Sequence, residues 1–165
     1  RRDALMFCLM LDHGMRVSEV ADLRIEDIDR TTKQMNFYRR KTGTYGKHNL
    51  RGRCWALMAQ YLTEDNTAQN GPLILASCKT GALIQKGMTT SALAERVTQL
   101  GRLAGIANLS PHDCRHAAAT WAGNDPNVSL AGLMSFGGWK SAQVAVNYLN
   151  QNDCDNDNVL LGLEI

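Results

Sequence analysis

Features that would place the chain in a membrane or a secreted class are missing. No apolar run approaches the roughly 20 residues needed to cross a bilayer. The opening residues, Arg1 to Ala4, lack the apolar segment of a signal peptide. The five cysteines are odd in number, widely spaced and without a C-x-x-C pair, which argues against a disulfide framework. We therefore expect a reduced, cytoplasmic protein.

The sequence also lacks an initiator methionine and internal repeats. At 165 residues it is about one domain long and can bury a core of its own. Because it opens directly into a helical pattern, we expect a further segment on its N-terminal side in a longer protein. Residues 150–158 are rich in Asn and Asp and precede a short apolar end. We thus expect one domain over residues 1–149 and a tail over residues 150–165.

Acidic residues are absent from residues 39–53. The whole chain has a formal net charge of only +2, which is weak evidence for a polyanionic partner. The acid-free stretch nevertheless holds six basic residues: Arg39, Arg40, Lys41, Lys47, Arg51 and Arg53. The β-favouring Phe37 and Tyr38, followed by Gly43 and Gly46, predict a hairpin with strands over 34–40 and 48–54. The cluster is therefore either a solvated hairpin or a contact for a polyanion.

Apolar residues at helical spacing predict helices through most of the remaining sequence. Ser18, Ser110 and Ser141 stand where N-caps are needed, and Pro111 suits a first helical position. The last of these helices is expected to carry Tyr148. A short strand is expected over residues 72–77. We therefore expect a mainly α-helical α+β fold with a small antiparallel three-stranded sheet.

Several side chains suit the cleavage of a phosphodiester, which needs a nucleophile, positive donors for the phosphate oxygens and an acid for the leaving alkoxide. A tyrosine can form a covalent intermediate that conserves the bond energy, so that rejoining needs no ATP. Arg16 and Arg115 carry planar guanidinium groups that bind two phosphate oxygens at once. His112, Arg115 and His116 stand at i, i+3 and i+4 of the expected helix and share one face.

Four motifs follow one another along the chain: HGMRVSEVADLR, RRKTG, SPHDCRHAAAT and GGWKSAQVAVNY. Together they resemble the catalytic domain of the tyrosine recombinases, the phage integrase family. The resemblance covers nearly the whole chain, from about Leu5 to Leu149. It implies the tyrosine recombinase catalytic-domain fold.

The first two motifs imply part of an active site by this resemblance. Arg16 matches the first catalytic arginine, and Glu19 its supporting residue. Lys41, at the hairpin turn, matches the general acid that protonates the 5′-hydroxyl leaving group. Lys47 is the alternative for that role.

The last two motifs imply the remaining catalytic residues. His112 and Arg115 match phosphate contacts, with His116 as a neighbouring support. Trp139 occupies a position that is His in most members, and its indole N–H can donate a hydrogen bond but cannot shuttle a proton. Tyr148, nine residues further on, matches the nucleophile that forms a 3′-phosphotyrosine.

The resemblance also implies site-specific recombination and its partners. Double-stranded DNA is the expected substrate, and no metal ion or other cofactor is implied. It further implies a homo-oligomer, a tetramer on DNA with a monomer possible without DNA, and a core-binding domain before this chain. The tail is expected to be either a flexible terminus or a segment that docks on a neighbouring protomer. Bacterial, phage or mobile-element origin follows in the same way. The residues expected on the DNA backbone are Arg39, Arg40, Lys47, Arg51 and Arg53.

Other interpretations remain open at this point. A type IB topoisomerase uses a similar residue set to relax DNA, and a catalytically silent relative would only bind DNA. Taken alone, Tyr148 is an ordinary core or interface aromatic, since Val144 precedes it by four residues. His112 and His116 flank Cys114, but their spacing matches none of the common structural zinc sites. Cys114 is expected to be a buried small residue.

Overall fold

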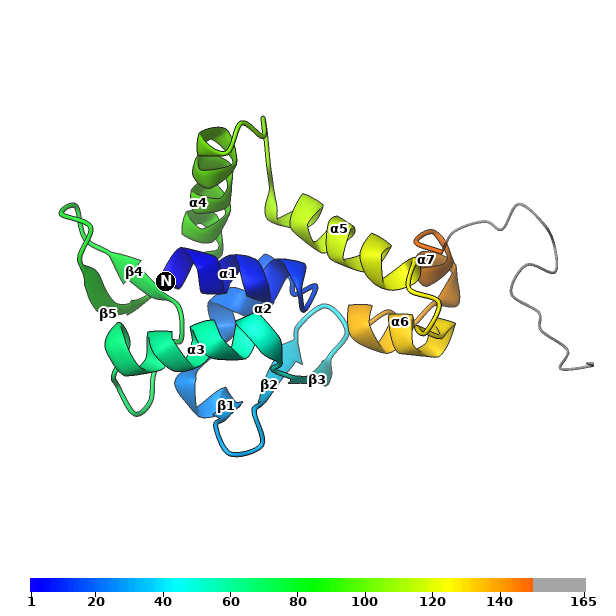
Figure 1. Ribbon diagram of the computed structural model, residues 1–165, viewed down its shortest axis with the longest axis horizontal. Helices are drawn as coiled ribbons and strands as arrows, with labels where there is room; N and C mark the ends of the chain where they lie inside the picture. Colours follow the sequence, from blue (N-terminus) through cyan, green and yellow to red (C-terminus); the bar gives the residue numbers. More distant parts are fainter. Residues whose placement is uncertain (150–165) are drawn as a thin grey trace, which may run out of the picture.

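The structure is a computed structural model that describes residues 1–149. The expected tail over 150–165 lies outside the described residues. Helices alternate with two small sheets along the chain (Figure 1). The elements are α1 (Arg2–Leu11), α2 (Val17–Asp22), the 3-10 turn η1 (Ile25–Asp27), β1 (Ile28–Asp29), β2 (Gln34–Arg39), β3 (Thr44–Asn49), α3 (Gly52–Glu64), β4 (Leu75–Ser77), β5 (Leu83–Gly87), α4 (Thr90–Leu103), α5 (Pro111–Gly123), α6 (Leu130–Gly137) and α7 (Ala142–Val146).

Helix α1 is the centre of the hydrophobic core. Leu5, Met6, Leu9 and Met10 recur at helical spacing, and all four are fully buried. The helix contacts α2, α3 and α5, and Figure 1 shows it near the middle of the molecule. Cys114 of α5 belongs to the same core, as expected from the sequence. The expected mainly helical α+β fold is confirmed.

The three-stranded antiparallel sheet has the order β1-β2-β3. The predicted hairpin exists, but the prediction of its second strand over 48–54 is wrong, since β3 begins at Thr44 and ends at Asn49. Gly46 does not turn the chain. It pairs with Phe37 inside the ladder, where a Cβ atom would lie 2.5 Å from the Phe37 ring. The turn instead ends at Gly43, whose φ of +66° favours glycine.

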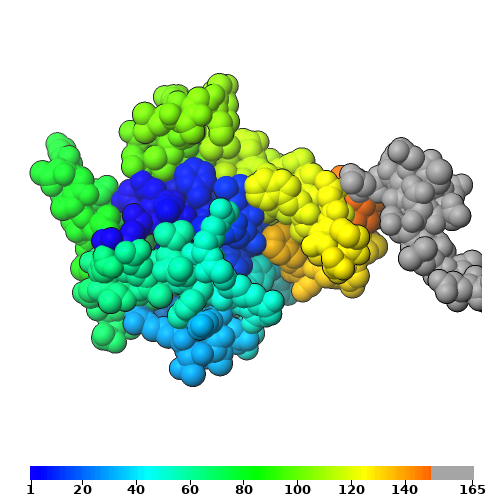
Figure 2. All heavy atoms as spheres, viewed as in Figure 1, coloured from blue at the N-terminus to red at the C-terminus, as the bar shows by residue number. Residues whose placement is uncertain are grey.

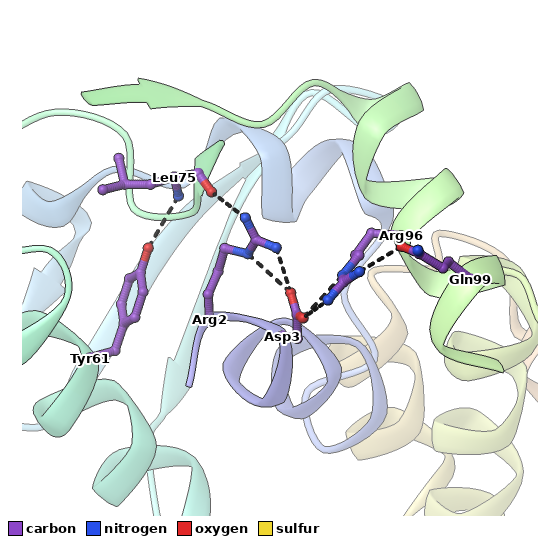
Figure 3. A network of polar contacts seen from close by, with 6 residues as sticks. All are labelled: Arg2, Asp3, Tyr61, Leu75, Arg96 and Gln99. Atoms are coloured by element: carbon purple, nitrogen blue, oxygen red, sulfur yellow. Dashed lines mark hydrogen bonds and ion pairs between the residues drawn. The ribbon is translucent and has the colours of Figure 1, made fainter. Parts of the chain in front are cut away.

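Strand β4 confirms the short strand expected near residues 72–77. It pairs with β5 in a separate two-stranded sheet that the sequence patterns did not predict. Asp3 in α1 ties this region to the core (Figure 3), because it accepts hydrogen bonds from Arg2 and from Arg96 of α4. Burial would raise the pKa of Asp3, but the bonds from Arg96 and Arg2 outweigh it and lower this pKa. Arg2 also donates to the carbonyl of Leu75 at 3.2 Å, so one carboxylate orders three elements.

Two of the predicted helix ends are wrong. Helix α2 begins one residue before Ser18, with Arg16 as its N-cap, because the Glu19 carboxylate accepts the Arg16 backbone N–H at 2.8 Å. Helix α7 ends at Val146, so Tyr148 lies in the turn beyond it rather than on the helix. The Tyr148 N–H still donates to the Ala145 carbonyl at 3.0 Å, which orders its backbone. Within the part of the chain that the structure describes, no helix has the length and apolar character to span a membrane.

Ser110 is expected to stabilise the start of α5. Its hydroxyl oxygen accepts the Asp113 N–H at 3.3 Å and donates to the Asp113 carboxylate at 2.7 Å. Loss of an N-cap costs about 1 kcal/mol, so Ser110→Ala should lower the free energy of unfolding by about that amount. Urea unfolding measures it. Ser141→Ala is the matched control, because Ser141 is an N-cap without a side-chain bond, and equal losses would contradict the prediction.

Candidate active site

Arg115 joins three segments that are distant in sequence. From the second turn of α5, its Nη1 donates to the Gly14 carbonyl, and its Nη2 donates to the Gly137 carbonyl at 2.6 Å. Gly14 follows α1 with φ +58°, and the ring of Phe136 fills the space where a Cβ atom would lie. The guanidinium therefore fixes the end of α6 against the loop that leads to Arg16.

Arg16 is held by one buried carboxylate. Its Nη1 donates to Glu19 Oε1 at 2.8 Å, while its backbone N–H donates to the other Glu19 oxygen. Glu19 is only 3% exposed. The Arg16 side chain keeps 19% of its surface accessible, so part of the guanidinium still faces solvent. Both the position and the orientation of Arg16 thus depend on Glu19.

The rings of Trp139, Tyr148, His116 and His112 form a continuous series. Trp139 and Tyr148 are stacked, with ring centroids 5.1 Å apart and an interplanar angle of 12°. His116 meets Tyr148 edge-on at 5.1 Å, and its own ring lies 6.5 Å from that of His112. Arg115 lies over the Trp139 ring at 5.5 Å. The predicted catalytic and supporting side chains on α5 and beyond are therefore in one cluster.

Two glycines let this cluster close. A Cβ atom at Gly137 would collide with the Trp139 indole, and one at Gly123 would collide with the Tyr148 carbonyl. The end of α5 consequently lies directly against the backbone of Tyr148, and the end of α6 lies directly against the Trp139 ring. Gly138 ends α6 in the left-handed conformation that favours glycine.

Positive charge is concentrated around the cluster. Burial, followed by the positive charge of Arg16, lowers the pKa of Arg115 to about 10, so Arg115 remains charged at neutral pH. Burial also lowers the pKa of Arg39, which is affected by the charges of Glu19 and Arg16. Glu19 is the acidic group that acts on both. Three guanidinium groups thus feel the charge of a single carboxylate, and only Arg16 is paired with it, an arrangement suited to an anion.

Lys41 and Lys47 occupy different places. Lys41 is exposed at the tip of the turn between β2 and β3. Lys47, on β3, lines a cavity of about 410 Å³ between the hairpin and the end of α6, together with Trp139 and Lys140. In this structure Lys47 is therefore the hairpin lysine that shares a cavity with a cluster residue.

The other basic residues of the hairpin region are not alike. Arg40 and Arg53 are exposed and form ion pairs with Asp22 and Asp12, respectively. Arg51 is exposed. Arg39 is 4% exposed, so it is not a surface cation as its place in the cluster suggested. Its inward orientation follows from the sheet, because Met35, Phe37 and Arg39 point to the same buried face.

His13, which opens the first motif, and His48 are neighbours of the site for which the sequence predicted no role. His48 stacks on Phe136 with ring centroids 5.8 Å apart, and His13 lies 5.5 Å from His48. Burial, with a smaller effect of His13, lowers the pKa of His48 to about 3. Both rings are therefore neutral packing groups between α1, β3 and α6. Across residues 1–149, no group of three or more His, Cys, Asp or Glu side chains is placed to hold a metal ion.

Several solved structures have the same architecture. XerA recombinase matches with a TM-score of 0.72 at 22% identity, over 92% of this chain and 54% of that one. XerH site-specific recombinase, bound to its difH substrate, matches with a TM-score of 0.70 at 19% identity, over 92% and 44%. A lambda integrase dimer bound to a core site matches with a TM-score of 0.68 at 14% identity, over 90% and 42%. The fold is that of a tyrosine recombinase catalytic domain.

The chain matches the model of the phage integrase family over residues 1–154 and belongs to that family. Among curated proteins, tyrosine recombinase XerC of Mycobacterium sp. strain KMS is 27% identical over 124 residues, which is 72% of this chain and 39% of the relative. The XerC proteins of strains JLS and MCS match equally well. The chain thus spans about two fifths of the length of these relatives.

Glu19 should contribute more to the free energy of unfolding than an exposed carboxylate does. Glu19→Gln removes the buried negative charge beside Arg16, and we expect it to lower the free energy of unfolding by about 2 kcal/mol. Asp22→Asn is the control, because the Asp22–Arg40 pair is exposed and should contribute less than about 1 kcal/mol. Urea unfolding compares the two variants. Similar losses would show that burial does not distinguish them.

Proposed function

We propose that this domain cuts and rejoins double-stranded DNA at specific sites through a covalent bond to Tyr148. The observation that carries the proposal is the contact series from Arg115 to Trp139 to Tyr148. It joins a guanidinium, an indole and a phenol whose residues match the family motifs. Arg16, held beside Glu19, supplies a second phosphate contact on the same loop that Arg115 orders.

The chemistry balances without an energy source. The Tyr148 oxygen attacks the scissile phosphorus, a new P–O bond forms and the bond to the 5′ oxygen breaks. The phenol proton passes to solvent, and the 5′ oxygen takes a proton from Lys41. Attack by a 5′-hydroxyl of another strand on the 3′-phosphotyrosine reverses the step and rejoins the DNA.

The arginines stabilise the negative charge that builds up on the non-bridging oxygens. Arg16 and Arg115 are held before substrate binds, and oriented donors of this kind contribute roughly 3 kcal/mol each to transition-state stabilisation. His112 contacts the phosphate from the exposed start of α5. Trp139 donates its indole N–H to the phosphate while its ring packs on Tyr148. His116 supports Tyr148 through its edge-on contact with the phenol ring.

Lys41 is the proposed acid because it occupies the lysine position of the hairpin motif. It is exposed at the turn, so DNA can approach it directly. Lys47 remains the alternative, and its place in the cavity beside Trp139 is the observation that favours it. Arg40, Arg51, Arg53 and Lys47 lie on the surface and are proposed to contact the DNA backbone.

The remaining proposals follow from family membership. Residues 1–149 act as the catalytic domain, and the tail over 150–165 docks on a neighbouring protomer in a tetramer assembled on DNA. The XerH structure is bound to its difH substrate and the lambda integrase dimer to a core site, which supports double-stranded DNA as the partner. A reaction on genomic or mobile DNA places the protein in the cytoplasm.

Tyr148→Phe is expected to abolish the covalent adduct with a nicked suicide substrate, because the attacking oxygen is removed. DNA binding, measured by fluorescence anisotropy, should stay within about threefold, since phosphate contacts dominate affinity. Tyr45→Phe is the matched control, as Tyr45 is 82% exposed on the hairpin, and its adduct should form normally. An adduct with the Tyr148→Phe variant would refute the nucleophile assignment, and no adduct with the parent would indicate a protein that only binds DNA.

Lys41→Ala should slow cleavage of ordinary DNA by roughly 10²-fold or more, the usual contribution of a general acid. A 5′-bridging phosphorothiolate should restore the rate, because a thiolate leaves without protonation. Gel assays of adduct formation measure both substrates, with Lys47→Ala as the matched control that should need no rescue. If Lys47→Ala is the variant that the sulfur substrate rescues, Lys47 is the acid.

A further inference from the structure

Arg39 differs from the other arginines around the site. Arg16, Arg40 and Arg53 each have a carboxylate partner, and Arg115 contacts two carbonyl groups. Arg39 is 4% exposed, and within residues 1–149 no carboxylate pairs with it. Its Nε is sealed from solvent without a hydrogen-bond partner among those residues. Burying a cation costs free energy unless it is paired and hydrogen-bonded.

The Arg39 side chain holds the end of α6. Its Nη2 donates to the Phe136 carbonyl at 3.1 Å, across 97 residues of sequence. The guanidinium stacks over Phe37 at 5.0 Å. A Cβ atom at Gly138 would collide with Arg39, so the absence of a side chain there lets the guanidinium reach the turn directly before Trp139. Figure 2 shows α6 packed against the hairpin region on the visible face.

His48 completes the support of this side chain. Its Nε2 lies 3.4 Å from Arg39 Nη2. Burial lowers the pKa of His48 to about 3, so the imidazole is neutral and its Nε2 can accept from the guanidinium. A charged imidazole would repel Arg39. The packing of His48 against Phe136 therefore favours one orientation of the arginine.

The Arg39 main chain holds the turn that carries Lys41. The N–H groups of Thr42 and Gly43 both donate to the Arg39 carbonyl, at 3.1 Å and 2.8 Å. Lys41 lies inside the loop that these two bonds close. One residue consequently connects the turn of Lys41, through its backbone, to the end of α6, through its side chain.

We propose that Arg39 is a positioning residue that fixes the Lys41 turn relative to the segment of Trp139 and Tyr148. The inference rests on the proposed function, in which Lys41 protonates the leaving 5′ oxygen. Arg39 does not touch the reacting atoms. It acts by keeping Lys41 within reach of the oxygen that departs when Tyr148 attacks, a placement in which an error of about 1 Å can cost roughly 10²-fold in rate.

The test compares two substrates and two variants in the whole protein. Arg39→Met replaces a buried charge by an apolar chain of similar length, a change that folded proteins often tolerate. Arg39→Lys keeps the charge but loses the guanidinium fork. Adduct formation is measured on a nicked suicide substrate with an ordinary phosphodiester and on one with a 5′-bridging phosphorothiolate. Thermal unfolding of each variant is recorded in parallel.

We expect both variants to be roughly 10²-fold slower than the parent on the ordinary substrate and within about threefold of it on the phosphorothiolate. The double variant Arg39→Met with Lys41→Ala should be no slower than Lys41→Ala alone, because both changes remove one function. A merely structural effect would slow both substrates equally.

Other outcomes distinguish a failure of the role of Arg39 from a failure of the role of Lys41. Equal slowing on both substrates, an unchanged rate on the ordinary substrate, or additive losses in the double variant would overturn the role of Arg39 while leaving Lys41 as the acid. If the phosphorothiolate substrate does not restore the rate of Lys41→Ala, Lys41 is not the general acid, and the inference on Arg39 fails with it. Loss of the adduct in the parent protein would refute the proposed function as a whole.

Discussion

The structure depends most on the guanidinium of Arg115 between two backbone carbonyls. Gly14 lies in the loop between α1 and Arg16, and Gly137 ends α6 just before Trp139. Arg115 on α5 binds the carbonyl groups of both glycines. Without these bonds, two buried carbonyls would lose their donor at a cost of about 1–3 kcal/mol each. A residue that is expected to hold phosphate is thus also the residue that assembles the site. A substitution of Arg115 would therefore affect both the proposed phosphate contact and the packing of the site.

Charge is arranged so that the site favours an anion before any is bound. Arg16, Arg39 and Arg115 share the field of Glu19, while the exposed Arg40 and Arg53 are balanced by acids of their own. Glu19 neutralises part of the charge and orients Arg16. Arg115 lies over the ring of Trp139, which in turn stacks on Tyr148. Such preorganised donors are the usual origin of large electrostatic contributions in phosphoryl transfer.

Local patterns predicted the mainly helical character and the Ser110 cap, because each depends on neighbours a few positions away, whereas the roles of the motif residues came from the resemblance to the family. Ser110 and the face shared by His112, Arg115 and His116 are examples. The patterns failed where long-range packing decides. Gly46 was predicted as a turn residue but lies in a strand against Phe37, and Arg39 was predicted on the surface but is buried. The roles of the Gly14 and Gly137 carbonyls could not be predicted, since backbone acceptors carry no residue signature.

The bond between Arg115 and Gly14 also bears on how the protein is made. It spans 101 residues, and the cluster around Tyr148 requires nearly all of the first 149. Contacts of such long sequence separation form late in folding, because the loop between them must close first. A nascent chain on the ribosome therefore carries isolated motifs but no assembled site. The cluster around Tyr148 is complete only once synthesis of the domain has ended.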